Sequence, residues 1–189
     1  PQKLGVDLMS ISSHKIHGPK GVGALYIRKG ARIVPLHYGG EQERKIRPGT
    51  ESLPLICAFA EAVKALPNID DQHEKIEELW NYCKEKVLEI PNVYINSPDG
   101  VLPYILNISA VGVRSETMLH YLAESGIYVS SGSACAKGKK SHVLTAMGLS
   151  PERIDSAIRI SFSKFNTKDD IDIFAEKLAE GMKNLAKSR

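Results

Sequence analysis

The stretch that decides the fold is GVDLMSISSHKIHGPKGVGALYIRK, residues 5–29. An apolar segment, residues 4–10, leads into a polar cluster and then into a turn rich in glycine and proline, residues 17–21. A second apolar segment follows at residues 24–27. This order predicts two strands joined by a loop. Chemical groups are often presented where a strand ends and such a loop begins, so the polar cluster at residues 12–15 is a candidate site.

Lys15 is the candidate residue of this cluster, which reads Ser12-Ser13-His14-Lys15. A lysine at a strand end could be partly desolvated, which would lower its pKa and make a neutral amine available for a Schiff base. The alternative is an ordinary solvated lysine, which position alone favours because most lysines are exposed.

A second turn, Arg47-Pro48-Gly49-Thr50, combines a hydroxyl with backbone amides and could hold a phosphate. Such short turns are common, so the turn alone is weak evidence.

The rest of the chain predicts helices alternating with short strands, the pattern of an α/β protein whose second half is a compact α+β unit. The expected helices cover residues 55–66, 70–88, 115–124 and 141–147, one that begins at Ser150-Pro151, and a C-terminal one capped by Thr167 and Asp170. The expected strands cover residues 93–95, 104–108, 127–129 and 157–161.

Cys135 lies in the polar segment of residues 130–140, which is rich in small residues and contains three lysines after the cysteine. Small residues would let this loop move, and the lysines would favour the thiolate, so we interpret Cys135 as a mobile nucleophile. An inert thiol is the alternative. Cys57 and Cys83 lie in apolar helical stripes, and we expect both to pack inside the protein.

Arg159 alternates with apolar neighbours in the expected strand of residues 157–161. Its guanidinium should therefore project away from the face that packs on the core. Arginine suits the bidentate binding of a carboxylate, and a surface salt bridge is the alternative.

Composition excludes several classes of protein. The 189 residues are 42% hydrophobic and 25% charged, which is typical of a folded protein, and the net charge of +3 indicates neither a nucleic-acid groove nor a membrane surface. There is no apolar run of membrane-spanning length and no signal peptide, so we expect a cytoplasmic protein. The three cysteines and six histidines show no metal-ligand spacing, so we predict no metal site.

The chain begins with Pro1 and enters an apolar segment within a few residues. A strand at such a position would lack its neighbours in a sheet. We therefore expect that the N-terminal portion of a longer protein is absent.

Taken together, these segments resemble the cysteine desulfurases of the NifS/IscS type, pyridoxal-phosphate-dependent enzymes of fold type I in the class-V aminotransferase group. The resemblance covers essentially the whole chain. It rests on residues 5–26, on residues 39–51, on Ser130-Ser131-Gly132-Ser133-Ala134-Cys135, and on residues 143–161.

The resemblance implies two domains. Residues 1–66 would be the C-terminal part of the cofactor-binding large domain, and residues 67–189 would be the small α+β domain that carries the cysteine loop. Family members are about twice as long as this chain. Their N-terminal half supplies several cofactor contacts, so we expect this chain to be the C-terminal half with an incomplete cofactor site.

The resemblance also implies the role of each candidate residue. Lys15 would form the Schiff base with pyridoxal 5'-phosphate, and Ser12 and His14 would contact the cofactor phosphate. Thr50 would reach the phosphate of the neighbouring subunit's cofactor. Arg159 would hold the carboxylate of the substrate, L-cysteine, and Cys135 would take its sulfur as a persulfide while L-alanine is released.

The implied partners are a second copy of the chain in a homodimer and a sulfur-acceptor protein, either an iron–sulfur scaffold or a thiolation enzyme. Two alternatives remain open. One is a catalytically silent module that forms dimers or docks a sulfur acceptor. The other is a related enzyme of the same fold, such as a selenocysteine lyase or an aminotransferase, although a plain aminotransferase would have no use for the Cys135 thiol.

Overall fold

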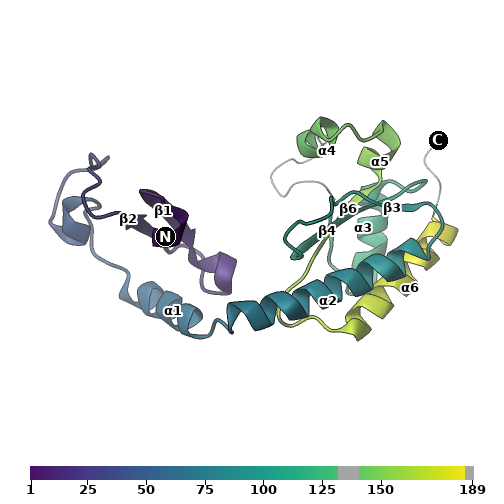
Figure 1. The fold of residues 1–189 in the computed structure, drawn as a ribbon, viewed down its shortest axis with the longest axis horizontal. Coiled ribbons are helices and arrows are strands. Elements are labelled where there is room, and N and C mark those ends of the chain that lie inside the picture. Colours follow the sequence, from purple (N-terminus) through teal and green to yellow (C-terminus); the bar gives the residue numbers. More distant parts are fainter. Residues whose placement is uncertain (132–140, 186–189) are drawn as a thin grey trace. The chain divides into compact units, whose positions relative to one another are not determined.

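The computed structural model describes residues 1–131 and 141–185. The chain divides into two compact units, Pro1–Asn68 and Ile69–Arg189, and each is described by itself (Figure 1).

The first unit is built on an antiparallel hairpin. Strand β1, Leu8–Ser12, pairs with β2, Gly23–Ile27, so that Leu8 lies opposite Ile27 and Ser12 lies opposite Gly23. Three short 3₁₀ turns and one helix complete the unit: η1, Gln2–Leu4; η2, Ser13–Ile16; η3, Gln42–Lys45; and α1, Leu53–Lys64.

The first strand begins later than the sequence predicted. Residues 2–4 form η1, which ends at Gly5 in the left-handed conformation with φ 64°. This conformation is readily available to glycine, and it separates η1 from β1. The hairpin prediction is otherwise confirmed.

The first unit has no buried hydrophobic side chain among its residues, and Ser13 is its one buried residue. Helix α1 packs beside η2 with Leu55, Phe59 and Ala62 half-buried, and it leaves other apolar residues exposed, including Leu53 and Val63. Cys57 on this helix is also exposed, so the expectation that it packs inside is wrong for this structure. Periodicity shows that a helix has an apolar stripe, but not that another layer covers it.

The second unit is a four-stranded antiparallel sheet in the order β3-β4-β6-β5. The strands are β3, Val93–Ile95; β4, Ile105–Ala110; β5, Ser130–Ser131; and β6, Ala157–Ser161. Its helices are α2, Ile69–Leu88; α3, Ser115–Glu124; α4, His142–Ala146; α5, Pro151–Asp155; and α6, Lys168–Asn184. Figure 1 shows α4 and α5 on one side of this sheet and α2 and α6 on the other.

The hydrophobic core of the second unit lies between one face of the sheet and helices α2, α3 and α6. It includes Ile76, Leu79, Cys83 and Val87 of α2, Leu106 and Ile108 of β4, Ile158 and Ile160 of β6, Met118 and Leu122 of α3, and Ile171, Phe174 and Leu178 of α6. Burial raises the pKa of the Cys83 thiol to about 12. The packed role predicted for Cys83 is confirmed.

Helix termini follow the signals in the sequence. The Ser150 hydroxyl accepts a hydrogen bond from the Arg153 amide at the start of α5. Thr167 and Asp170 form the expected capping box at the start of α6. The N-cap of α3 is Arg114 rather than Ser115, a difference of one residue.

The strand expected at residues 127–129 lies instead at Ser130–Ser131. Gly126, with φ 75°, ends α3, and the Ile127 amide donates to the Leu122 carbonyl at 3.0 Å. Residues 127–129 therefore lead out of the helix before pairing with β6 begins.

Candidate functional site

The first cluster of candidate residues lies on η2 at the end of β1. The Ser13 amide donates to the Val22 carbonyl at 3.2 Å, and the Gly18 amide donates to the Ser13 carbonyl at 3.0 Å. These bonds hold a tight turn. Ser12, His14 and Lys15 are exposed on it, so the partial burial expected for Lys15 is not observed.

The turn closes through an unusually near approach of Gly18 to Ser13. A Cβ atom on Gly18 would lie 2.1 Å from the Ser13 Oγ atom, closer than non-bonded atoms can approach. Ser13 is fully buried, and its Oγ atom has no hydrogen-bond partner among the described residues. Glycine at position 18 is therefore a requirement of the turn that presents Lys15.

The donor set of this turn suits a phosphorylated aldehyde such as pyridoxal phosphate. The hydroxyl of Ser12 and the imidazole of His14 are phosphate-binding groups, and the amine of Lys15 is the group that condenses with an aldehyde. All three are on consecutive or nearly consecutive residues and are accessible to a ligand. The residues of this chain therefore fit the cofactor.

Thr50 is exposed in the turn of residues 47–50. The Gly49 amide donates to Gln42 Oε1 at 3.2 Å, and Arg47 Nη1 donates to the Pro48 carbonyl at 3.0 Å. One of the backbone amides of the proposed phosphate-binding turn is thus already occupied. Among the described residues, no hydrogen bond joins this turn to η2.

Arg159 lies in the second unit, on the face of the sheet opposite the hydrophobic core. Its neighbours Ile158 and Ile160 are buried in that core, as the alternation in the sequence predicted. Arg159 Nη2 donates to Ser130 Oγ at 3.3 Å, while Arg159 Nε is buried and has no partner in the described part of the chain. No carboxylate of residues 1–131 or 141–185 pairs with Arg159, so the surface salt bridge considered as an alternative is not observed.

Cys135 lies outside the described residues. The structure places Ser12 at the end of β1 and His14 and Lys15 on the η2 turn that follows it. Thr50 lies elsewhere in the first unit, and Arg159 lies in the second unit.

The sequence interpretation missed a group of hydrogen-bonded polar residues that includes Asn107, the neighbour of Arg159 on β4. Asn96 and Ser109 are buried, and Asn107 and Arg153 are partly buried. Asn96 Nδ2 donates to both Asn107 Oδ1 and Ser109 Oγ at 2.7 Å, and Arg153 Nη2 donates to Asn96 Oδ1 at 2.5 Å. A signal was present, because Asn107 and Ser109 alternate with apolar residues along β4.

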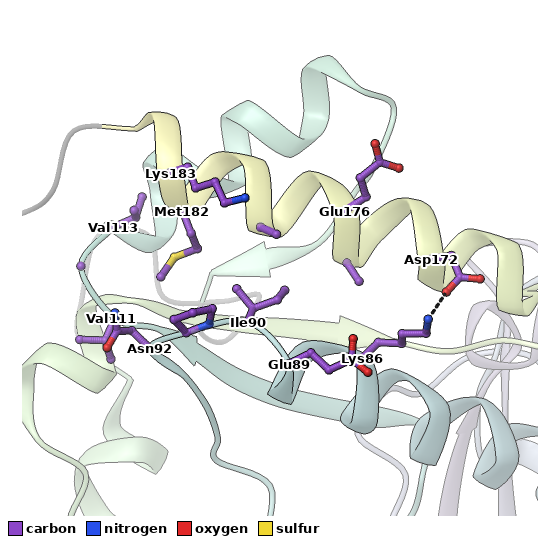
Figure 2. A pocket seen from close by; sticks show the side chains of 14 residues that line it. Lys86, Glu89, Ile90, Asn92, Val111, Val113, Asp172, Glu176, Met182 and Lys183 are labelled. Atoms are coloured by element: carbon purple, nitrogen blue, oxygen red, sulfur yellow. Dashed lines mark ion pairs between the residues drawn. The ribbon is translucent and has the colours of Figure 1, made fainter.

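A cavity of about 1060 Å³ lies between the C-terminal end of α2, helix α6 and residues 111–113, which connect β4 to α3 (Figure 2). Ile90, Val113 and Met182 line it together with charged side chains, and the Lys86 ammonium pairs with Asp172 at 3.2 Å. Of the candidate site residues that the structure describes, none lines this cavity. The cavity is a groove between packed elements of the second unit and is separate from the candidate residues.

Residues 1–131 and 141–185 contain neither a metal-binding cluster nor a membrane-spanning helix. No group of three or more histidine, cysteine, aspartate or glutamate side chains there could hold a metal ion. No helix in the same residues has both the length and the apolar character needed to cross a membrane.

Comparison with known proteins identifies the family. The sequence model described as "Aminotransferase class-V" matches residues 1–174. The cysteine desulfurase IscS of Methanosarcina thermophila is 40% identical over 188 residues, which are 97% of this chain and 46% of that protein. The chain thus spans about half the length of the curated relatives that it matches.

Solved structures agree with the sequence comparison. A NifS-like protein superposes with a TM-score of 0.84 at 38% identity, over 97% of this chain and 48% of that one. A structure described as "SspA in complex with cysteine" has a TM-score of 0.65 and 32% identity, over 88% of this chain and 46% of that one. The chain belongs to the class-V aminotransferase family, and its fold is that of the pyridoxal-phosphate-dependent enzymes of fold type I.

Proposed function

We propose that this chain supplies part of the active site of a cysteine desulfurase, which converts L-cysteine to L-alanine and retains the sulfur on Cys135. The relative from Methanosarcina thermophila carries the name of this activity, and the related SspA structure is described as a complex with cysteine. The observation in this chain that carries the proposal is Arg159, whose buried Nε has no acceptor among residues 1–131 and 141–185. A substrate carboxylate is the acceptor that a guanidinium binds best.

Lys15 would hold the cofactor, pyridoxal 5'-phosphate, with Ser12 and His14 on its phosphate. When bound, the cofactor supplies an electron-withdrawing ring that stabilises negative charge at the substrate Cα. Thr50 would contact the phosphate across the interface of a homodimer. The exposure of all four residues in the first unit supports this assignment, because each can reach a ligand.

The neutral amine of Lys15 would take the proton from the substrate Cα. Arg159 would hold the substrate carboxylate and so fix the direction in which the substrate side chain points. The thiolate of Cys135 would attack the substrate sulfur, so that a sulfur–sulfur bond forms on Cys135 while the bond between the substrate Cβ and its sulfur breaks. The Cβ atom would then take one proton, and Lys15 would return a proton to Cα, which gives L-alanine. The persulfide on Cys135 would then pass to an acceptor protein, either an iron–sulfur scaffold or a thiolation enzyme, in the cytoplasm.

A second candidate function is a catalytically silent module that forms dimers or docks an acceptor. The observation that favours it is the first unit, whose apolar side chains, such as Leu36 and Leu53, are exposed and would be stabilised by a partner. Cofactor binding distinguishes the two functions.

The test is reduction with borohydride after adding pyridoxal phosphate to the purified chain, followed by peptide mapping. We expect one cofactor per chain, trapped on Lys15. The adduct should be absent from Lys15→Arg and unchanged in the matched control Lys20→Arg, because Lys20 is an exposed lysine of the same loop that the proposal does not use. Adducts scattered over surface lysines, or no adduct, would favour the silent module.

A further inference from the structure

Four polar side chains form a row across the sheet of the second unit, at right angles to its strands. Asn107 of β4 lies opposite Arg159 of β6, and Arg159 lies opposite Ser130 of β5. Asn96, directly after β3, continues the row, because its amide donates to the Asn107 carbonyl at 2.8 Å. The row is on the face of the sheet opposite the hydrophobic core, and Figure 1 shows α5, the helix that contains Arg153, on the side of the sheet away from α2 and α6.

The hydrogen-bond direction along this row is fixed by Arg153. A guanidinium can only donate, so the Asn96 amide oxygen must be the end that faces Arg153 Nη2 at 2.5 Å. The Asn96 amino group then donates to Asn107 Oδ1 and to Ser109 Oγ, each at 2.7 Å. Ser109 Oγ in turn donates to the Arg153 carbonyl at 2.7 Å, which leaves it able to accept from Asn96.

The same logic orients Asn107. Its oxygen accepts from Asn96, so the other end of its amide is the Nδ2 amino group, a donor. The neighbour of Asn107 across the strands is Arg159, which is also only a donor, and the buried Arg159 Nε has no partner among the described residues. Arg153 Nε likewise lacks one, but the Arg153 guanidinium already donates to two acceptors and lies 5.4 Å from the centre of the Tyr94 ring.

Of these two neighbouring donors, the buried Arg159 Nε needs an acceptor, and one acceptor with two oxygens could serve both. A carboxylate has two oxygens, carries a negative charge, and accepts several hydrogen bonds at once. A neutral acceptor would leave the positive charge of the partly buried Arg159 uncompensated.

We propose that Asn107 is a second donor to the substrate carboxylate, beside Arg159, and that Asn96 and Arg153 are positioning residues that keep the Asn107 amino group free to donate. This inference rests on the proposed function, because it takes Arg159 as the carboxylate-binding residue. It adds a binding residue and fixes how that residue is oriented.

The experiment is an NMR titration of the ¹⁵N-labelled full chain with L-alanine, whose carboxylate matches that of the substrate. Alaninol, which lacks the carboxylate, is the matched control ligand. The Arg159 Nε signal, identified by its loss in Arg159→Lys, and the Asn107 side-chain amide signals should shift with one common Kd. Alaninol should shift neither.

Two variants of Asn107 test its role. Asn107→Asp keeps the acceptor for Asn96 but replaces the donor by a negative charge, and Asn107→Ala removes the donor without adding charge. We expect a loss in affinity of roughly tenfold or more for Asn107→Asp and a smaller loss for Asn107→Ala. Asn92→Asp adds the same charge beside the cavity of Figure 2 and should bind as the original chain does.

Asn96→Asp tests the positioning role. The new carboxylate can still accept the hydrogen bond from Arg153, but it has no amino group to donate to Asn107. The Asn107 amide should therefore rotate, so that its amino group donates to residue 96 and its oxygen faces Arg159. Affinity for L-alanine should fall roughly tenfold while the backbone amide spectrum of the sheet is retained.

The outcomes separate this inference from the proposed function. If the Arg159 signal responds to L-alanine but both Asn107 variants bind L-alanine as tightly as the original chain does, the role of Asn107 is refuted. The role of Arg159 as a carboxylate-binding residue then stands. An unchanged affinity in Asn96→Asp refutes the positioning role. If Arg159 does not respond to L-alanine at all, the carboxylate site fails, and with it both this inference and the role of Arg159 in the proposed function.

Discussion

Replacing Gly18 with alanine should open the turn that presents Lys15, and the structure gives the size of the effect. The added Cβ would lie 2.1 Å from Ser13 Oγ, 3.1 Å from the Ala62 Cβ atom and 3.2 Å from the Ser13 carbonyl oxygen. Two non-bonded atoms cannot stay 2.1 Å apart, so the Ser13 hydroxyl or the backbone of the turn must move. Because Ser13 is fully buried, we expect that moving its hydroxyl away from the new Cβ disturbs the packing and destabilises the turn by about 1–3 kcal/mol, the usual range for overpacking.

The same geometry predicts that Ser13→Ala rescues Gly18→Ala. The Ser13 hydroxyl makes no hydrogen bond with the described residues, so its removal alone should be neutral or stabilising by up to about 1 kcal/mol. In the double variant the 2.1 Å clash is gone and only the two contacts above 3 Å remain. We therefore expect a favourable coupling of about 1–2 kcal/mol between the two substitutions.

The assay is hydrogen exchange of the Ser13 amide, which donates to the Val22 carbonyl and so reports the opening of this turn. Exchange should be faster in Gly18→Ala, unchanged or slower in Ser13→Ala, and largely restored in the double variant. Cofactor trapping on Lys15 should follow the same order. Additive effects of the two substitutions would refute the reasoning, because they would mean that the Ser13 hydroxyl and position 18 do not meet.

Three further predictions concern the second unit and its contrast with the first. Thr167→Ala removes one half of the capping box of α6 and should lower the free energy of unfolding by about 1 kcal/mol in urea titrations, whereas Thr167→Ser should be nearly neutral. In the folded chain at about pH 8, iodoacetamide should modify the exposed Cys57 and spare Cys83, because burial raises the pKa of the Cys83 thiol to about 12. Peptide mass mapping measures the labelling of each cysteine, and equal labelling would contradict the packing of α2. The hydrogen bond from the Tyr82 hydroxyl lowers the pKa of Asp172. The stability that this carboxylate contributes is therefore present above its ordinary pKa and is lost as the pH falls through the lowered value. The difference in urea midpoint between the original chain and Asp172→Asn should shrink over that acidic range, and a constant difference would count against the interaction.

The elements of the second unit were predictable because local patterns and tertiary packing agree there. The spacing of Ile76, Leu79, Cys83 and Val87 predicts one buried stripe, and all four side chains are buried against the sheet. The alternation around Arg159 likewise predicted which way its guanidinium points.

Sequence patterns could not show what depends on contacts between distant residues. Arg153 and Asn96 are 57 residues apart, so their hydrogen bond, which orients the row beside Arg159, has no local signature. The apolar stripe of α1 was predicted from the sequence, but whether the stripe is buried depends on other elements packing on it, and periodicity does not show that. Cys57 was misplaced for this reason.

The candidate site was predicted in part. The sequence predicted Ser12, His14 and Lys15 at a strand end, and the structure has Ser12 as the last residue of β1 and His14 and Lys15 on the tight 3₁₀ turn that follows. The dependence of that turn on the contact between Ser13 and Gly18 was not predictable, because it arises from the folding of the loop back onto the turn.

The most direct test of the central claim is the mass of the Cys135 peptide after the full chain, loaded with pyridoxal phosphate, is mixed with L-cysteine. The account predicts one additional sulfur atom on Cys135, none on Cys57 or Cys83, and one L-alanine released for each persulfide formed. Loss of both products in Cys135→Ala, with the cofactor still trapped on Lys15, would complete the agreement. An unmodified Cys135, with or without L-alanine in solution, would contradict the claim that this thiol takes the sulfur.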